Sequence, residues 1–252
     1  MYLFISLYII FFYSKFTWEI VIVDDGSPAR KDGTPDPTAA LVQRDYVNKL
    51  GSDNVRLCKL YKNLGKGGAV RKGTLRTRGK YIIFADADGA TQASDLYRLY
   101  TEIQKIEKNG HGIAVGSRRH ADEEKSANRT IFRKLLGWGF HTLIKLLVGG
   151  HDIQDTQCGF KMFTRATAAR IFSIQHIERW AFDVELLYLA AHFNVPMVEV
   201  PVTWNEIDGS TLNPVDAAIQ MARDVFIIRL AYVFGIWKYT ENTTILDNKK
   251  TN

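Results

Sequence analysis

The chain has 252 residues, 46% of them hydrophobic and 24% charged, which is ordinary for one large α/β domain with a buried core. Its formal net charge is +6, which suits an anionic ligand or an anionic membrane surface. No zinc finger, homeodomain or RNP motif occurs in the sequence, so nucleic acid is not an expected partner. Cys58 and Cys158 lack metal-ligand spacing and are expected to be free thiols, with a single disulfide as the alternative.

An apolar run without charge opens the chain, because residues 1–13 read MYLFISLYIIFFY. A membrane-spanning helix needs about 20 residues, and a signal peptide would carry a basic start and a small-residue cleavage site. The run is rich in β-branched and aromatic residues, so a buried strand is one alternative. The interpretation we favour is that residues 1–16 are a remnant membrane anchor or an aberrant start, followed by a domain at 17–239 and a polar tail at 240–252.

Strands and helices alternate in the first half of the domain. Strands are predicted at 19–23, 55–61, 81–85 and 112–116, with helices between them at 38–50, 67–77 and 95–108. This rhythm is typical of an α/β fold with a mostly parallel sheet flanked by helices. Right-handed crossovers bring the carboxyl ends of such strands to one edge of the sheet.

The second half of the domain is less regular. Residues 129–148 alternate basic with large apolar residues, which fits a helix lying in a membrane interface or a core helix with a basic solvated face. Residues 217–237 predict a strongly apolar helix that is either a core helix or a second membrane-apposed one. The remaining predictions are a strand at 159–163, a helix at 180–193 and an extended segment at 195–204.

Two carboxylates end the predicted strand at 81–85, where the sequence reads YIIFADADGA. An apolar strand does not bury two carboxylates along its length, so Asp86 and Asp88 are expected at its carboxyl end, where open α/β sheets bind ligands. Such a pair suits a hard divalent cation that keeps open positions for phosphate oxygens. A solvated turn is the alternative for the motif taken alone.

A segment rich in glycine and lysine, NLGKGGAVRKGT, occupies residues 63–74. It matches neither the P-loop nor the dinucleotide-binding fingerprint, which argues against an ATPase or a dehydrogenase. Lys62 and Lys66 still lie beside a predicted helix start, which favours anions.

Six segments occur in a fixed order along the chain. They are VDDGS at 23–27, NLGKGGA at 63–69, DADGA at 86–90, GSR at 116–118, DTQCGFKMF at 155–163 and ERWAFDVELL at 178–187. Together they resemble the inverting family-2 glycosyltransferases of the GT-A fold, and more closely the eukaryotic dolichyl-phosphate β-glucosyltransferases. The resemblance covers residues 17–239, and the last two segments are its most specific part.

The resemblance implies transfer of glucose from UDP-glucose to dolichyl phosphate, giving dolichyl β-D-glucosyl phosphate and UDP for protein N-glycosylation. It also implies an endoplasmic reticulum membrane protein whose catalytic domain faces the cytosol, and Lys249 and Lys250 resemble a dilysine retrieval signal. Mg²⁺ or Mn²⁺ held by Asp86 and Asp88 would neutralise charge on the leaving diphosphate. Because the acceptor phosphate is already ionised near neutral pH, no strong general base is required.

Site residues carried over from the resemblance fall into four groups. The catalytic group is Asp86, Asp88, Asp155 and Asp183. The nucleotide-binding group is Asp24, Asp25, Gly26, Ser27, Lys66, Asp86 and Ala87. The acceptor-phosphate clamp is Arg118, Arg129 and Arg133. Gln157 and Arg179 are assigned to the donor sugar or its surroundings.

The chain departs from the family pattern at its start. Family members have a strand ending in a PxYNE-type motif and a helix before VDDGS, whereas here the run 1–13 stands in that place. The fold is therefore expected to be N-terminally truncated. Two further readings stay open: a polyprenyl-phosphate mannosyltransferase, and a catalytically inactive nucleotide-binding or scaffold homologue.

Overall fold

The structure is a computed structural model of the whole chain, and it describes residues 3–7, 17–27, 33, 38–86, 88–118, 153–205 and 214–240. The strands are β1 (Leu3–Leu7), β2 (Ile20–Asp24), β3 (Val55–Lys59), β4 (Tyr81–Asp86), β5 (Ile113–Ser117), β6 (Phe160–Thr164) and β7 (Met197–Pro201). The helices are α1 (Thr38–Val42), α2 (Asn48–Leu50), α3 (Gly65–Thr74), α4 (Leu96–Ile106), α7 (Arg165–Ile174), α8 (Phe182–His192) and α9 (Pro214–Val233). A π-helical turn (Gln43–Val47) joins α1 to α2, and a 3₁₀ turn (Ala93–Asp95) precedes α4.

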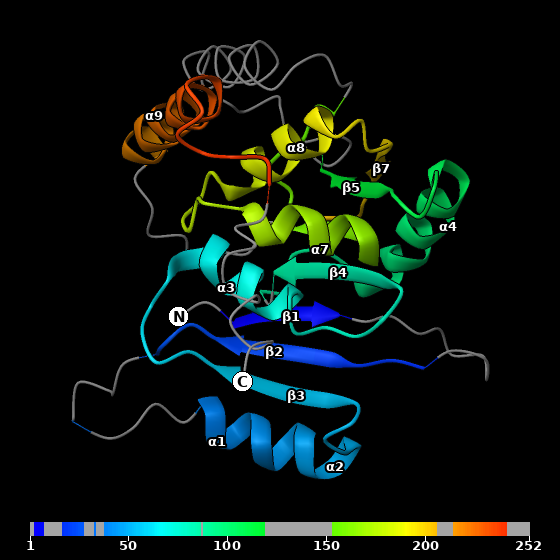
Figure 1. Cartoon of the computed structure of the whole chain (residues 1–252). Coiled ribbons are helices and arrows are strands. Elements are labelled where there is room, and N and C mark those ends of the chain that lie inside the picture. Colours follow the sequence, from blue (N-terminus) through cyan, green and yellow to red (C-terminus); the bar gives the residue numbers. More distant parts are fainter. Residues whose placement is uncertain are drawn as a thin grey trace, which may run out of the picture.

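The strands form one mixed sheet in the order β3-β2-β1-β4-β6-β5-β7 (Figure 1). β1 and β6 run antiparallel to their neighbours, so β2, β3, β4, β5 and β7 share one direction. The carboxyl ends of β2 and β4 therefore meet at the same edge, where Asp24 pairs with Leu3 and Asp86 pairs with Phe4 of the strand between them. Two strand spacings, about 10 Å in all, separate these two aspartates along the edge.

β1 lies between β2 and β4 in the sheet. Its residues 3–7 come from the apolar run, and they pair with both β2 and β4. Residues 3–7 are therefore a strand of the sheet, which was the alternative interpretation of the apolar run. The physical reason is that β-branched and aromatic residues favour strands, and that the edges of β2 and β4 need a pairing partner between them.

Alternate side chains of β4 point to opposite faces of the sheet and pack into two separate hydrophobic clusters. Ile82 and Phe84 of β4 face the cluster made with α3, α7, α8 and α9, whereas Ile83 and Ala85 face the cluster made with α4. Figure 1 shows α3 and α7 in front of the strands and α4 at the right, beside β5 and β7, which it contacts. This period of two is what a strand buried on both faces requires.

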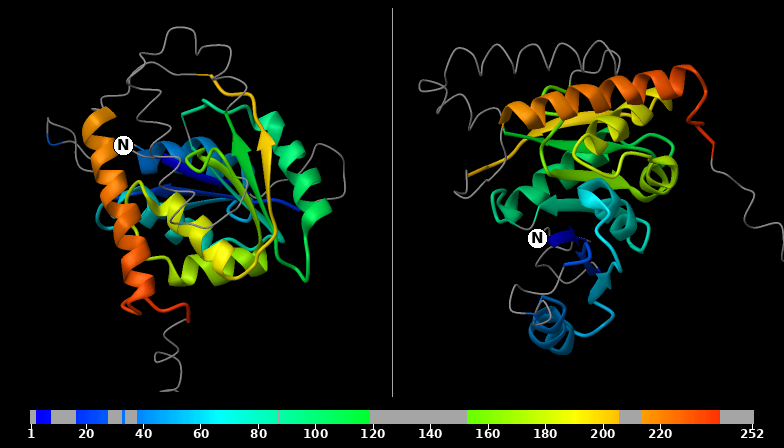
Figure 2. Two further views of the ribbon diagram at one scale, coloured as in Figure 1. Left: turned by 90° about the horizontal axis from the view of Figure 1, so that it is seen from above. Right: turned by 90° about the vertical axis from the view of Figure 1, so that its left-hand side faces the viewer.

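α9 packs with one side on α8 and runs along the outside of the described structure (Figure 2). Among its described side chains, the buried apolar ones are Val225, Ile228, Ala231 and Tyr232. Among the described helices, none is both long and apolar enough to cross a bilayer. The helix predicted at 129–148 lies outside the described residues, as does most of the polar tail.

Candidate active site

The end of β2 places two buried carboxylates against the start of α3. Leu64 and Gly65 each donate a backbone N–H to the Asp25 carboxylate at 2.8 Å, so both of its oxygens are engaged. Burial raises the pKa of Asp25. The hydrogen bonds from the two amides act in the opposite direction but do not outweigh burial. Asp24 accepts the Ser27 N–H at 2.9 Å through Oδ1, while its Oδ2 is buried without a partner in the described part of the chain.

Gly26 fixes the turn that follows these carboxylates. Its φ is +68°, a conformation that glycine adopts readily, and a Cβ there would lie 2.6 Å from the Lys62 carbonyl carbon. The turn is therefore held against the residues that lead into α3. This explains on physical grounds why glycine stands in VDDGS.

Lys66 connects the start of α3 to the end of β4. Its Nζ donates to Asp86 Oδ2 at 2.7 Å, and its side chain is only 10% exposed. Asp86 Oδ1 is buried and has no partner among the described residues. Gly159 makes room for this carboxylate, because a Cβ there would lie 2.0 Å from Asp86 Oδ2.

A buried ion pair lies behind Asp86. Lys161 of β6 is fully buried and donates to Asp183 Oδ1 at 2.5 Å and to the Cys158 carbonyl at 2.6 Å. Burial raises the pKa of Asp183, while the positive charges of Lys161 and Lys66 act to lower it. Lys161 was missed by the sequence reasoning, although a lysine inside the apolar strand FKMFT signals a buried partner.

A third ion pair follows the end of β5. Arg118 donates Nε and Nη2 to the two oxygens of Asp155, each at 2.8 Å. Burial alone would raise the pKa of Asp155, but the hydrogen bonds and charge of Arg118 outweigh it and hold that pKa below its usual value. Glu199 of β7 accepts the backbone N–H groups of Gln154 and Asp155, which fixes the segment that carries this pair.

The remaining predicted site residues take part in none of these ion pairs, and three of them lie outside the residues that the structure describes. Asp88 is exposed and accepts the Ala90 N–H at 2.9 Å. Arg179 is exposed, and its Cγ lies close to Gly65 at the start of α3. Gln157 buries an Nε2 with no partner in the described ranges. The residues outside the description are Ala87, Arg129 and Arg133.

Together these groups form a row of charge along one edge of the sheet. The pairs are Lys66–Asp86, Lys161–Asp183 and Arg118–Asp155. The charge of Asp86 acts on the pKa of Asp183, and that of Lys161 acts on the pKa of Asp155, so the pairs are close enough to interact. Within the described ranges, no group of three or more His, Cys, Asp or Glu residues could hold a metal ion. Three buried polar atoms at this edge nevertheless have no hydrogen-bond partner among the described residues, namely Asp24 Oδ2, Asp86 Oδ1 and Gln157 Nε2.

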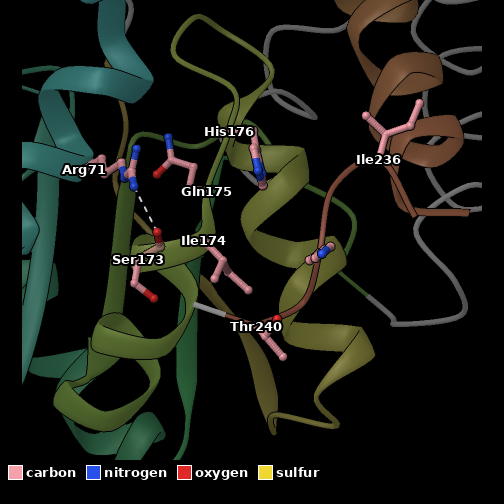
Figure 3. A pocket seen from close by; sticks show the side chains of 8 residues that line it. Arg71, Ser173, Ile174, Gln175, His176, Ile236 and Thr240 are labelled. Carbon is pink, nitrogen blue, oxygen red and sulfur yellow. Dashed lines mark hydrogen bonds between the residues drawn. The ribbon is translucent and has the colours of Figure 1, made fainter. Parts of the chain in front are cut away.

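A cavity of about 690 Å³ lies away from this row. Figure 3 shows it between α3, the end of α7 and the segment after α9, with Arg71 donating to the Ser173 carbonyl. Its lining residues are Arg71, Ser173, Ile174, Gln175, His176, Ile236, Lys238 and Thr240, none of which was predicted as a site residue. The row at the strand edge, which holds the vacant polar atoms, is therefore the better candidate for catalysis.

Comparison with known proteins gives a consistent result. The sequence profile of "Glycosyl transferase family 2" matches residues 13–172. A dolichyl-phosphate β-glucosyltransferase of Dictyostelium discoideum is 53% identical over 226 residues, covering 89% of this chain and 66% of the relative. The human protein of the same name is 49% identical over 226 residues, covering 88% of this chain and 67% of that protein. The chain thus spans about two thirds of the length of these curated relatives.

Solved structures overlap more loosely. The crystal structure of glucosyl-3-phosphoglycerate synthase from Mycobacterium tuberculosis with UDP covers 79% of this chain and 65% of its own, at 14% identity and a TM-score of 0.49. The resemblance stated from the motifs is confirmed by the family match and the two relatives, and the α/β class is confirmed with a mixed sheet.

Proposed function

The chain belongs to glycosyl transferase family 2, and from this premise we propose that it transfers glucose from UDP-glucose to dolichyl phosphate with inversion. The products are dolichyl β-D-glucosyl phosphate and UDP, for use in protein N-glycosylation. The observation that carries the proposal is the Lys66–Asp86 pair at the strand edge, in a chain 53% identical to a relative named for this reaction.

The donor's nucleotide would lie along the ends of β2 and β4. Asp24 Oδ2 has no partner among the described residues, whereas both oxygens of Asp25 are engaged by backbone amides. We therefore assign the contact with uracil or ribose to Asp24, and to Asp25 the task of holding the start of α3. The diphosphate would lie near Lys66, where an ammonium group and a helix N-terminus both favour negative charge.

A divalent cation, Mg²⁺ or Mn²⁺, fits the end of β4. Asp86 Oδ1 is a buried carboxylate oxygen without a partner in the described structure, and Asp88 presents a second, exposed carboxylate two residues later. Hard cations prefer carboxylate oxygens of this kind. Asp86 and Asp88 would hold the ion, which when bound supplies positive charge for the leaving diphosphate.

The reaction needs little proton transfer from the protein. An oxygen of the acceptor phosphate attacks C1 of glucose, and the bond from C1 to the UDP oxygen breaks on the opposite side, which inverts the configuration. Because the attacking phosphate is already ionised, the site needs cationic side chains that bind it and no strong general base. Arg118 is assigned to this clamp with Arg129 and Arg133, and Asp155 orients it through the two 2.8 Å contacts.

A membrane position follows from the lipid acceptor, and the outer side of α9 supports it. Large apolar residues are exposed there: Ile219, Phe226, Ile227, Leu230, Val233, Phe234 and Ile236. Arg223, Arg229 and Lys238 are also exposed, and Asp224, the one acidic residue between 219 and 240, is buried. An apolar strip with basic neighbours suits a bilayer that contains anionic lipid. We propose that this side lies on the endoplasmic reticulum membrane, with the domain in the cytosol.

The membrane proposal is tested by vesicle flotation. The full chain should float with phosphatidylcholine vesicles that contain phosphatidylserine, and Phe226→Asp should reduce the bound fraction. Tyr97→Asp is the matched control, because Tyr97 is equally exposed on α4 (55% against 54% for Phe226). Equal binding by the two variants would contradict the assignment of α9.

Donor and acceptor are tested with purified full chain. It is given dolichyl phosphate with Mg²⁺ or Mn²⁺ and either UDP-glucose or GDP-mannose, and lipid-linked sugar is counted. Glucose transfer that is lost in Asp86→Asn supports the proposal. Mannose transfer instead would support the mannosyltransferase reading, and UDP binding without any transfer would support the inactive homologue.

A further inference from the structure

Glu185 is a fully buried carboxylate of α8 to which the sequence assigned no role. The backbone N–H of His176 donates to its Oε1 at 2.9 Å, and that of Ile177 donates to its Oε2 at 2.7 Å. Tyr232 of α9 donates its hydroxyl to Oε1 at 2.9 Å, and the His176 ring lies beside the same oxygen. A carboxylate buried so completely is stabilised by donors of this kind, and they fix its position in turn.

The segment that Glu185 holds rests on the first turn of α3. The Glu178 carbonyl accepts the Gly68 N–H at 2.9 Å, and Gln175 donates Nε2 to the carbonyls of Gly67 and Ile177. The approach is too close for side chains, because a Cβ on Gly67 would lie 2.6 Å from the Ile177 carbonyl oxygen. A shift of residues 175–180 would therefore displace the start of α3.

The first turn of α3 carries the cation of the proposed donor site. Lys66 lies one residue before Gly67, and its Nζ binds Asp86 at 2.7 Å. The Trp180 ring, at the end of the same segment, lies 5.8 Å from that Nζ. The position of Lys66 thus depends on the segment, and the position of the segment depends on Glu185.

Tyr232 brings α9 into this chain of contacts. Its hydroxyl donates to Glu185 Oε1, and burial together with the Glu185 charge raises the pKa of Tyr232 above its ordinary value. On the open side, His176 stacks on Trp237 at 4.4 Å and lines the cavity of Figure 3.

We propose that Glu185 and Tyr232 are positioning residues for the UDP-sugar site. They hold residues 175–180 against α3 and so keep Lys66 at Asp86. This rests on the proposed function for the identity of the ligand. The positioning itself is a property of the free protein.

The test compares two variants that each remove one phenol hydroxyl. Tyr232→Phe deletes the donor to Glu185 and keeps the ring. Tyr239→Phe is the matched control, because its hydroxyl pairs with that of Tyr188 at 2.9 Å in the same aromatic cluster and does not touch Glu185. Tyr232→Phe should raise KM for UDP-glucose about tenfold, with kcat and KM for dolichyl phosphate changed less than threefold. The control should leave all three within twofold.

Amide hydrogen exchange supplies a readout that needs no ligand. The N–H groups of His176, Ile177 and Gly68 should exchange about tenfold faster in Tyr232→Phe than in the control, at matched melting temperatures. Faster exchange in Tyr232→Phe without any glucose transfer by the unaltered chain would contradict the proposed function and still support the positioning role. Equal exchange in both variants, or an unchanged KM for UDP-glucose in Tyr232→Phe, would overturn the positioning role.

Discussion

Gly159→Ala perturbs the proposed donor site by one methyl group. The new Cβ would lie 2.0 Å from Asp86 Oδ2 and 2.4 Å from its Cγ. Real contacts of this kind stop at about 3.0 Å, so the Asp86 carboxylate must move by about 1 Å. It can do so, because the side chain is 31% exposed, and the backbone of β6 can then stay in place.

The magnitude follows from what that movement breaks. We expect a shift of this size to break the hydrogen bond that Lys66 Nζ donates to Asp86 Oδ2 at 2.7 Å. A hydrogen bond between charged groups contributes about 1.5–3 kcal/mol, and a misplacement of about 1 Å costs about 100-fold in rate. We expect kcat/KM for UDP-glucose to fall about 100-fold, with the free energy of unfolding reduced by about 1–2 kcal/mol.

The assay is initial-rate glucose transfer to dolichyl phosphate at several UDP-glucose concentrations, with chemical denaturation in parallel. Gly112→Ala is the control, since its Cβ would lie 3.3 Å from Ile103 Cγ1, a tight contact that this side chain can relieve by a few tenths of an ångström, and Asp86 is not among its nearest neighbours. The reasoning is refuted if Gly159→Ala keeps kcat/KM within threefold of the unaltered chain.

Three further predictions follow from the same edge of the sheet. Asp24→Asn should weaken UDP binding about tenfold by calorimetry, because it alters Oδ2, a buried acceptor without a partner among the described residues; unaltered affinity would remove Asp24 from the nucleotide site. The folded-state pKa of Asp155 is lowered, so its stabilising effect is present above the unfolded pKa of about 3.9 and disappears as pH falls through the folded value. Urea titrations should accordingly show Asp155→Asn less stable than the unaltered chain at pH 6, with the gap closing below about pH 4. Burial raises the pKa of Cys158 to about 12, so mass spectrometry after iodoacetamide should find Cys158 unmodified in the folded protein and Cys58, which is half-buried, modified first.

The site's location could be predicted from the sequence because carboxylates cannot be buried along an apolar strand. Asp24 and Asp86 were expected at strand ends that share an edge, and the register of β1 places them there. The free thiols and the main alternation of strands and helices were predicted on similarly local grounds. Each of these features depends on hydrophobic pattern and turn residues, which a single sequence displays.

Other features depend on partners that are remote in the sequence. The central, antiparallel place of β1 follows from pairing with β2 and β4, and an apolar run does not disclose its partners. The hydrogen bonds from the start of α3 to both Asp25 oxygens could be seen only in the folded structure. The same holds for the contacts of Glu185 with residues 176, 177 and 232. α7 was not predicted, although its buried residues Ala168, Ile171 and Phe172 repeat at helical spacing, because a run of ten residues displays this periodicity only over a few turns.

The anomeric configuration of the product tests the central claim most directly. The full chain is incubated with UDP-glucose, dolichyl phosphate and Mn²⁺, and the lipid-linked product is isolated for proton NMR of its sugar. UDP-glucose is an α-glucoside, so inversion predicts a β-linked glucosyl phosphate. An α-linked product, or no lipid-linked glucose from protein that binds UDP, would contradict the account.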